Sequence, residues 1–298
     1  AGLAGVAIGL VRRCKVVYWV MDLNPDQMIA LGLVAERSLR ARVFRAFNRA
    51  ILRRADDVVV LDRFMAERVL KLVDVAAKMS VMPPWPHEDA LESIDHANNP
   101  FRDRHGLKGK FVVMYSGNHS PANPITTVLD AARQLEGDER FVFMFIGGGT
   151  GKKEVEERVA GGANNIRALP YQPLSEIKYS LSAGDLHVVS IGDGVVGIVH
   201  PCKVYGAMAV ERPILLLGPG VSHVSDLIDR HAIGRHIRHG DVEGCVRAIT
   251  ELAGAPPGEL SVMGRRAGEV IETMLGKKQL CGQFCDVLQR ALPAPAQV

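Results

Sequence analysis

The feature of this sequence that most constrains its fold is a regular alternation of short apolar stretches with helix-like stretches between residues 111 and 217. The apolar stretches are rich in β-branched and aromatic residues, as buried strands are. Strands that alternate with helices at this spacing predict an α/β fold with a parallel, doubly wound sheet. We expect strands at 111–116, 141–146, 166–168, 186–191 and 214–217, and helices at 125–135, 153–159, 175–182, 204–210 and 224–231.

The rest of the chain predicts further elements of both kinds. Strands are expected at 16–21 and 58–61, and helices at 27–54, 65–72, 242–252, 257–274 and 279–292. Residues 80–86 are too rich in proline to continue a helix or a strand, and with the polar stretch up to residue 100 they predict a linker. The first ten residues resemble the middle of a helix, so we expect the chain to start part-way into a domain.

Composition excludes several classes of function. A length of 298 residues allows two domains, and 47% hydrophobic residues allow a sizeable core. A net charge of +3 is too weak to indicate nucleic-acid binding. The five cysteines show neither a pairing pattern nor metal-ligand spacing, which favours a reducing compartment and no metal site.

The segment 192–218 carries the strongest indication of chemistry. It is a glycine-containing loop that follows a predicted strand, passes through His200 and Lys203, and leads into a helix. Such a loop, feeding a helix N-terminus at the carboxyl edge of a sheet, is where α/β folds bind phosphorylated ligands. The charge of Lys203 and the helix dipole would act on the same anion. His200 is either a second ligand contact or a hydrogen-bonded structural residue.

Two glycine segments follow the first two strands of the region 111–217. Gly117 would let a phosphate or sugar approach the backbone, and a plain strand-to-helix turn is the alternative. The run 146–152, IGGGTGK, is not a P-loop, because the required first glycine falls on Ile146 and Lys153 stands where Ser or Thr is needed. This second loop either lines the ligand site or is a flexible loop at the sheet edge.

The predicted helix 27–54 is strongly basic and amphipathic. Glu36 is its only acidic residue. A helix of this kind can lie on an anionic membrane surface, although a solvated basic face over an ordinary core stripe is the alternative. The arginines are Arg37, Arg40, Arg42, Arg45, Arg49, Arg53 and Arg54.

The order of these motifs resembles the family 4 glycosyltransferases, which have the GT-B fold of two Rossmann-like domains. The resemblance rests on residues 17–23, 53–57, 115–118, 145–149, 200–205 and 207–214, and is greatest to the branch that builds bacterial capsule, colanic-acid and O-antigen polysaccharides. It implies that residues 1–83 are the C-terminal part of an incomplete acceptor domain and 84–100 a linker. Residues 101–275 would then form the nucleotide-sugar domain, and 276–298 a helix that crosses back, with a tail.

The resemblance also implies an activity and a set of site residues. The expected enzyme is a retaining glycosyltransferase of the hexosyltransferase type. It would move a sugar from a nucleotide sugar to a lipid-linked or polysaccharide acceptor, without metal or other cofactor, at the cytoplasmic face of the membrane. Lys203, Asp22 and His200 are the expected catalytic residues. The expected donor-binding residues are Gly117, Asn118, Gly147, Gly148, Pro201, Cys202, Val204 and Tyr205.

The sequence departs from the family pattern at several positions. Asn118 and Asn123 stand where many members have Arg and Lys, and Gly206 stands where a ribose-binding Glu is usual. Met21 replaces a common histidine, and Glu211 a common glycine. These losses favour a second hypothesis, a non-catalytic GT-B partner that binds sugar nucleotide or membrane. A sugar-nucleotide epimerase is a third, although no clear set of acidic and histidine residues supports it.

Overall fold

The computed structural model describes residues 2–85, 91–256 and 258–292, which divide into two compact units. The division falls after Trp85, Asp193, His200 and Met274. The first unit therefore combines the start of the chain with the short segment Gly194–His200 and the last helix. The second unit contains the region in which strands and helices alternate.

The second unit is built on a parallel sheet of six strands in the described part of the chain, in the order β6-β5-β4-β7-β8-β9. The order reverses beside β4, which pairs with both β5 and β7. This switch point is where open α/β sheets bind ligands at their carboxyl edge. The strands are β4 (Phe111–Ser116), β5 (Phe141–Ile146), β6 (Ile166–Leu169), β7 (Leu186–Ser190), β8 (Ile214–Leu217) and β9 (Gly234–Ile237).

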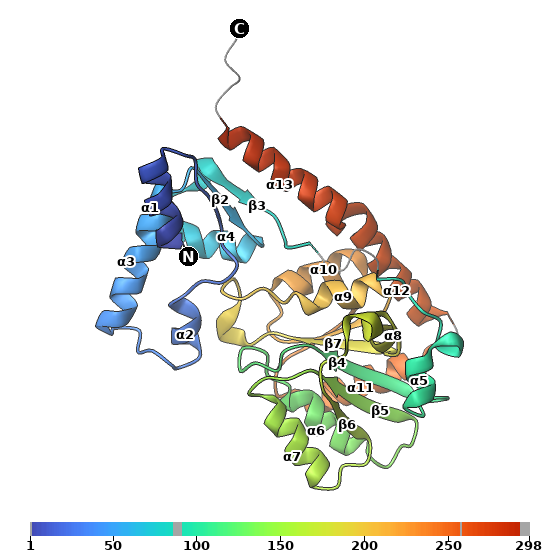
Figure 1. Ribbon diagram of the computed structural model, residues 1–298. Coiled ribbons are helices and arrows are strands. Elements are labelled where there is room, and N and C mark those ends of the chain that lie inside the picture. The colour runs from blue at the N-terminus through green and yellow to red at the C-terminus, as the bar shows by residue number, and fades with distance from the viewer. Residues whose placement is uncertain (1, 86–90, 257, 293–298) are drawn as a thin grey trace. The chain divides into compact units, whose positions relative to one another are not determined.

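Helices cover both faces of this sheet, because alternate strand residues point to opposite sides. Val113, Tyr115 and Phe143 pack with α6, α7 and α11, whereas Val112 and Met114 pack on the other face. Figure 1 shows α6 and α7 on one side of the strands and α8 and α9 on the other. The helices are α5 (Pro100–Arg104), α6 (Thr126–Gln134), α7 (Lys152–Ala160), α8 (Ile177–Ser182), α9 (Lys203–Ala209), α10 (His223–His231), α11 (Val242–Ala253) and α12 (Glu259–Val270).

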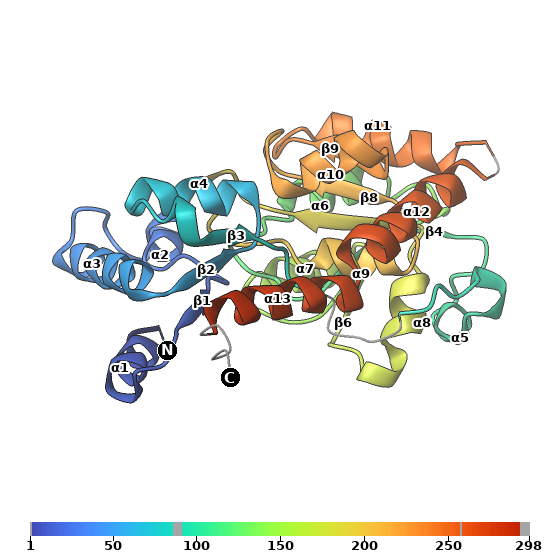
Figure 2. The ribbon, with the colours of Figure 1, turned by 90° about the horizontal axis from the view of Figure 1, so that it is seen from above.

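The first unit has a parallel sheet of three strands among its described residues, in the order β1-β2-β3. Its strands are β1 (Val17–Trp19), β2 (Asp57–Val60) and β3 (Met79–Val81). Figure 2 shows α1 and α4 on different sides of these strands. The helices are α1 (Gly2–Arg12), α2 (Asp26–Ala30), α3 (Leu39–Arg54), α4 (Arg63–Leu72) and α13 (Lys277–Ala291).

The segment Gly194–His200 folds as part of the first unit, although the sequence-based boundaries included it in 101–275. Ile198 belongs to the first unit's core, and its carbonyl accepts a hydrogen bond from Leu23 N at 3.1 Å. The Arg68 guanidinium donates to Val196 O at 2.6 Å. The segment follows β7 closely in sequence, so residue spacing alone gives no sign that it packs elsewhere.

Most predicted elements appear within a residue or two of their expected bounds, but three local differences have clear causes. The helix predicted at 27–54 is broken, because Gly32 adopts a φ of +71° and a new helix starts where Ser38 caps the amide of Ala41. The last strand, β9, was not predicted, because its sequence GRHI is short and half polar. Strand β3 covers the start of the run 80–86, where neither a helix nor a strand was expected, and it ends at Val81, before the first proline of that run.

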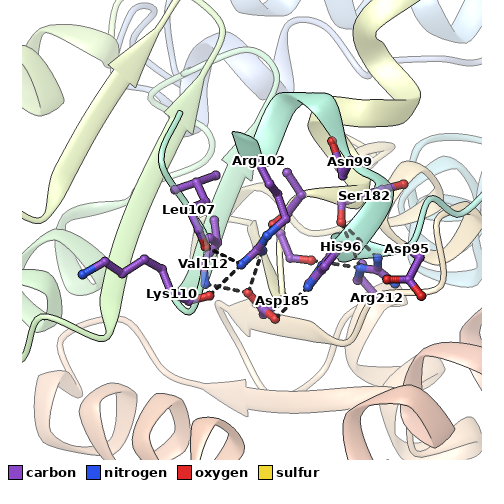
Figure 3. Close-up of polar contacts among 12 residues, drawn as sticks. Asp95, His96, Asn99, Arg102, Leu107, Lys110, Val112, Ser182, Asp185 and Arg212 are labelled. Carbon is purple, nitrogen blue, oxygen red and sulfur yellow. Dashed lines mark hydrogen bonds and ion pairs between the residues drawn. The ribbon is translucent and has the colours of Figure 1, made fainter. Parts of the chain in front are cut away.

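A polar network closes the amino edge of the second unit's sheet (Figure 3). The buried Arg102 guanidinium donates to Asp185 and to three backbone carbonyls, and Asp185 also accepts from Val112 N at 2.8 Å. Arg212 donates to the carbonyls of Ile94 and Ser182, which holds the segment before α5 against the sheet. Both guanidinium groups therefore donate most of their hydrogen bonds to backbone carbonyls. The network stabilises the fold at the edge of the sheet opposite the switch point.

Candidate functional site

The candidate site lies at the carboxyl ends of β4 and β5, where two glycines bring the strand ends together. Gly117 and Gly147 both have a φ of +126°, which residues with a side chain rarely adopt. A Cβ on Gly147 would overlap the Gly117 carbonyl, and Gly117 N donates to Ile146 O at 2.9 Å. Both glycines are therefore required for this close approach, whatever they bind.

Lys203, the first residue of α9, lies across Gly117. A Cβ on Gly117 would come within 2.8 Å of Lys203 Cε, and the ammonium lies 5.1 Å from the centroid of the Tyr115 ring. Burial lowers the pKa of Lys203 to about 8. Among the residues that the structure describes, no oxygen accepts a hydrogen bond from this ammonium. A half-buried cation without an acceptor is suited to an anionic ligand.

Lys152, the first residue of α7 after the glycine-rich loop that follows β5, has a different role. Its ammonium donates to Gly147 O at 2.6 Å and also to Leu169 O. His119 N donates to Gly148 O at 2.7 Å, which ties this loop to the one after β4. Lys152 therefore stabilises the loop, in agreement with the prediction that the run 146–152 is not a P-loop.

The residues around the start of α9 are held by local contacts. Val204 N donates to Pro201 O at 3.2 Å, so this amide is engaged in the turn. Cys202 is exposed at the N-cap position and its side chain does not cap the helix. The buried Tyr205 hydroxyl lies 2.9 Å from His223 Nε2. Lys203 is the charged group that this part of the chain presents.

The second unit thus brings together Lys203, Gly117, Asn118, Gly147 and Gly148. Asn118 is exposed, next to the strand ends, and carries no charge. Among the residues described, no group of three or more His, Cys, Asp or Glu side chains is arranged to hold a metal ion.

Two of the expected catalytic residues, His200 and Asp22, belong to the first unit. His200 Nδ1 lies 2.8 Å from Asp62 Oδ2, and both side chains are buried. Asp62 also caps α4 through Met65 N. This geometry fixes His200 within the first unit's core. Asp22 follows β1 closely, on the exposed surface, and partial desolvation raises the pKa of its carboxyl group.

Sequence reasoning missed Tyr171, which follows β6. Its side chain is 59% exposed, and its ring lies against Gly147 and Gly148, with carbon atoms 3.3 and 3.1 Å from where their Cβ atoms would be. An exposed aromatic face at a ligand-binding edge can stack on a nucleotide base. The signal was present in the sequence PYQP, an aromatic residue between prolines directly after a strand.

Comparison with curated proteins finds one relative at the sequence level. No family model matches the chain. It is 28% identical over 243 residues to the probable glycosyltransferase WbjE of Pseudomonas aeruginosa, a match that covers 80% of this chain and 60% of that protein. The chain therefore spans less than two thirds of the length of this relative.

Three solved structures have a similar fold. Anabaena HepE, in complex with UDP and glucose, has a TM-score of 0.78 at 15% identity, covering 97% of this chain and 75% of its own. Sucrose-phosphate synthase from Thermosynechococcus elongatus has a TM-score of 0.76 at 17% identity, covering 97% and 71%. WaaG, a glycosyltransferase involved in lipopolysaccharide biosynthesis, has a TM-score of 0.69 at 15% identity, covering 93% and 80%. The predicted α/β fold with parallel sheets of the GT-B type is thus confirmed.

Proposed function

We propose that this chain is a retaining glycosyltransferase of family 4. It would transfer a hexosyl group from a nucleotide sugar to a lipid-linked or polysaccharide acceptor in the synthesis of capsule, O-antigen or a related cell-envelope polysaccharide. The observation that supports this most directly is the side chain of Lys203, which lies over Gly117 at the switch point of the sheet with no acceptor for its ammonium among the described residues. The similarity to WbjE and the UDP complex of HepE favour the same activity.

The chemistry requires stabilisation of a departing diphosphate. In the transfer, the bond between the anomeric carbon and the diphosphate oxygen breaks, and the acceptor oxygen forms a bond to that carbon on the same face. The acceptor proton passes to the leaving phosphate, so no protein nucleophile is needed. Lys203 would stabilise the negative charge that develops on the diphosphate, and the backbone at Gly117 would allow its close approach. We therefore propose that no metal is needed.

The nucleotide would occupy the same edge of the second unit. Tyr171, with its ring exposed over Gly147 and Gly148, is placed to stack on the base. Asn118 can offer amide hydrogen bonds to the phosphates but no charge, which leaves Lys203 as the principal cation. We therefore expect nucleotide affinity to depend more strongly on this one lysine than it would in a site with several cations.

A lipid-linked acceptor would suit attachment at an anionic membrane surface. On α3, Val43, Phe44 and Phe47 are exposed, and Arg40 lies on the same helix. Two of the seven arginines named for membrane contact already have partners in the protein. Arg45 forms ion pairs with Asp26 and Glu36, and Arg49 donates a hydrogen bond to Leu72 O. None of the helices in the described ranges has the length and apolar character of a membrane span. We propose peripheral binding through α3.

One assay tests the enzymatic proposal. The protein is mixed with a panel of UDP- and GDP-sugars and lipid acceptors, and release of the nucleoside diphosphate is followed. Turnover is expected, and the anomeric configuration of the product, read by NMR, is expected to match that of the donor. Nucleotide binding without turnover would favour the non-catalytic GT-B partner, which the uncharged Asn118 and Asn123 make the second candidate.

The membrane proposal is tested separately by sedimentation with vesicles. Binding to vesicles with anionic lipid, but not to neutral ones, is expected for the wild-type protein. The double variant Phe44→Ser/Phe47→Ser should lose most of this binding. If the wild-type protein sediments with anionic vesicles no more than with neutral ones, and no more than the variant does, a solvated basic face is favoured instead.

A further inference from the structure

His119 is a buried polar residue directly after the candidate residues Gly117 and Asn118. Its exposed fraction is 1%, and neither ring nitrogen has a hydrogen-bond partner of good geometry among the described residues, although the backbone of Gly117 and Gly148 lies close to the imidazole. The ring packs between Tyr115, at 4.7 Å between centroids, and Phe145, at 6.4 Å. A phenylalanine would fill the same aromatic slot without burying unpaired nitrogens. The fold therefore bears a cost at this position that packing does not explain.

The position of the ring connects it to the candidate site. His119 N donates to Gly148 O and His119 O accepts from Gly151 N, so the residue joins the loops after β4 and β5. Burial and the charges of Lys152 and Lys203 lower the pKa of His119 to about 4, so the imidazole is neutral at pH 7 and one nitrogen carries a hydrogen.

Tyr115 links His119 to the proposed phosphate-binding lysine. The ammonium of Lys203 and the imidazole of His119 both pack against the Tyr115 ring. Each has hydrogen to donate, and neither has a hydrogen-bond acceptor of good geometry among the described residues. The two donors therefore share one neighbouring ring, beside the glycines of the switch point.

We propose that His119 is a further ligand-binding residue of this site, donating its imidazole N–H to a phosphate oxygen of the bound nucleoside diphosphate. The inference rests on the proposed function and adds a residue to it. The cost of burying His119 in the unliganded protein is then recovered on binding.

The experiment compares His119→Phe with His119→Gln, using UDP as the probe. Phe keeps the aromatic packing and removes the nitrogens, so its Tm should rise by roughly 2–4 °C, while its affinity for UDP falls at least tenfold. Gln keeps an N–H donor, so its affinity should stay within about threefold of the wild type. His119→Met replaces Phe if the aromatic variant does not fold.

A matched control is His187, a second buried histidine of the same unit, whose pKa burial also lowers to about 4. Its Nε2 is hydrogen-bonded to Leu181 O at 2.9 Å, so His187→Phe should lower the Tm and leave UDP affinity unchanged. If the wild type binds UDP and His119→Phe binds it equally well, the inference about His119 is overturned and the proposed function stands. If the wild type binds no nucleoside diphosphate, both are overturned.

Discussion

The pH dependence of nucleotide binding is a specific consequence of the position of Lys203. Burial lowers the pKa of Lys203 from 10.5 to about 8 in the unliganded protein. A bound diphosphate would hold the ammonium in its charged form, so affinity should fall as the pH rises through 8. With this pKa, about nine in ten side chains are charged at pH 7 and about one in ten at pH 9. The dissociation constant for UDP should therefore rise roughly tenfold between these two pH values.

Calorimetric titration with UDP at several pH values measures this effect. Lys203→Met keeps the shape of the side chain and removes its charge, and its profile corrects for titration of the ligand and of other groups. For folding, the sign is opposite. Because the folded-state pKa is lowered, the charged form disfavours folding, and this loss of stability disappears as the pH rises from about 8 to 10.5. Lys203→Met should therefore raise the Tm at pH 7. A parallel loss of affinity in both proteins would refute the assignment of the charge to Lys203.

Three further predictions concern other parts of the chain. Gly206 stands where a ribose-binding Glu is usual, and a Cβ added there would have its nearest non-neighbouring atom 3.5 Å away. Gly206→Glu should therefore tighten UDP binding several-fold, about 1 kcal/mol, whereas Gly206→Ala should not. Unchanged titration curves for both variants would contradict this. Glu211→Gly should raise the Tm by relieving a φ of +55°, worth about 1 kcal/mol, whereas Gly264→Ala should lower it, because the new Cβ would overlap the Glu211 carbonyl. Asp62→Ala removes the cap of α4 and the hydrogen bond to His200. It should lower the free energy of unfolding, measured by denaturant titration, by about 2–4 kcal/mol. A loss under about 1 kcal/mol would show that the Asp62–His200 pair contributes little to stability.

The sequence predicts the fold of the second unit well, because its strands are long apolar runs with strong periodicity. The bounds of β4, β5 and β8 agree with the expected 111–116, 141–146 and 214–217. Short or polar elements are less predictable, since little side-chain burial distinguishes them. The edge strand β9 and the break at Gly32 depend on tertiary pairing and on a single backbone torsion, which residue patterns do not reveal.

The candidate site is predictable in part for the same reason. Lys203 and Gly117 are far apart in sequence, but parallel strands bring their carboxyl ends to one edge, so their proximity follows from the fold class. His200 is only three residues from Lys203, yet it is paired with Asp62 in the other unit. Sequence spacing does not reveal that the boundary between the two units falls directly after His200. Tyr171 was missed although it stands between prolines directly after a strand, because this arrangement belongs to no recognised motif.

The role of Lys203 as the diphosphate-binding cation can be tested by equilibrium binding of UDP and GDP to the wild-type protein, Lys203→Met and Lys108→Met. Lys108 is exposed and lies in the turn before β4, at the opposite edge of the sheet, so its variant matches the loss of charge. We expect one of the nucleotides to bind the wild type and Lys108→Met with equal affinity. Lys203→Met should bind it about 10- to 150-fold more weakly, corresponding to about 1.5–3 kcal/mol. Equal affinity of the three proteins would contradict the assignment of this edge as the diphosphate site.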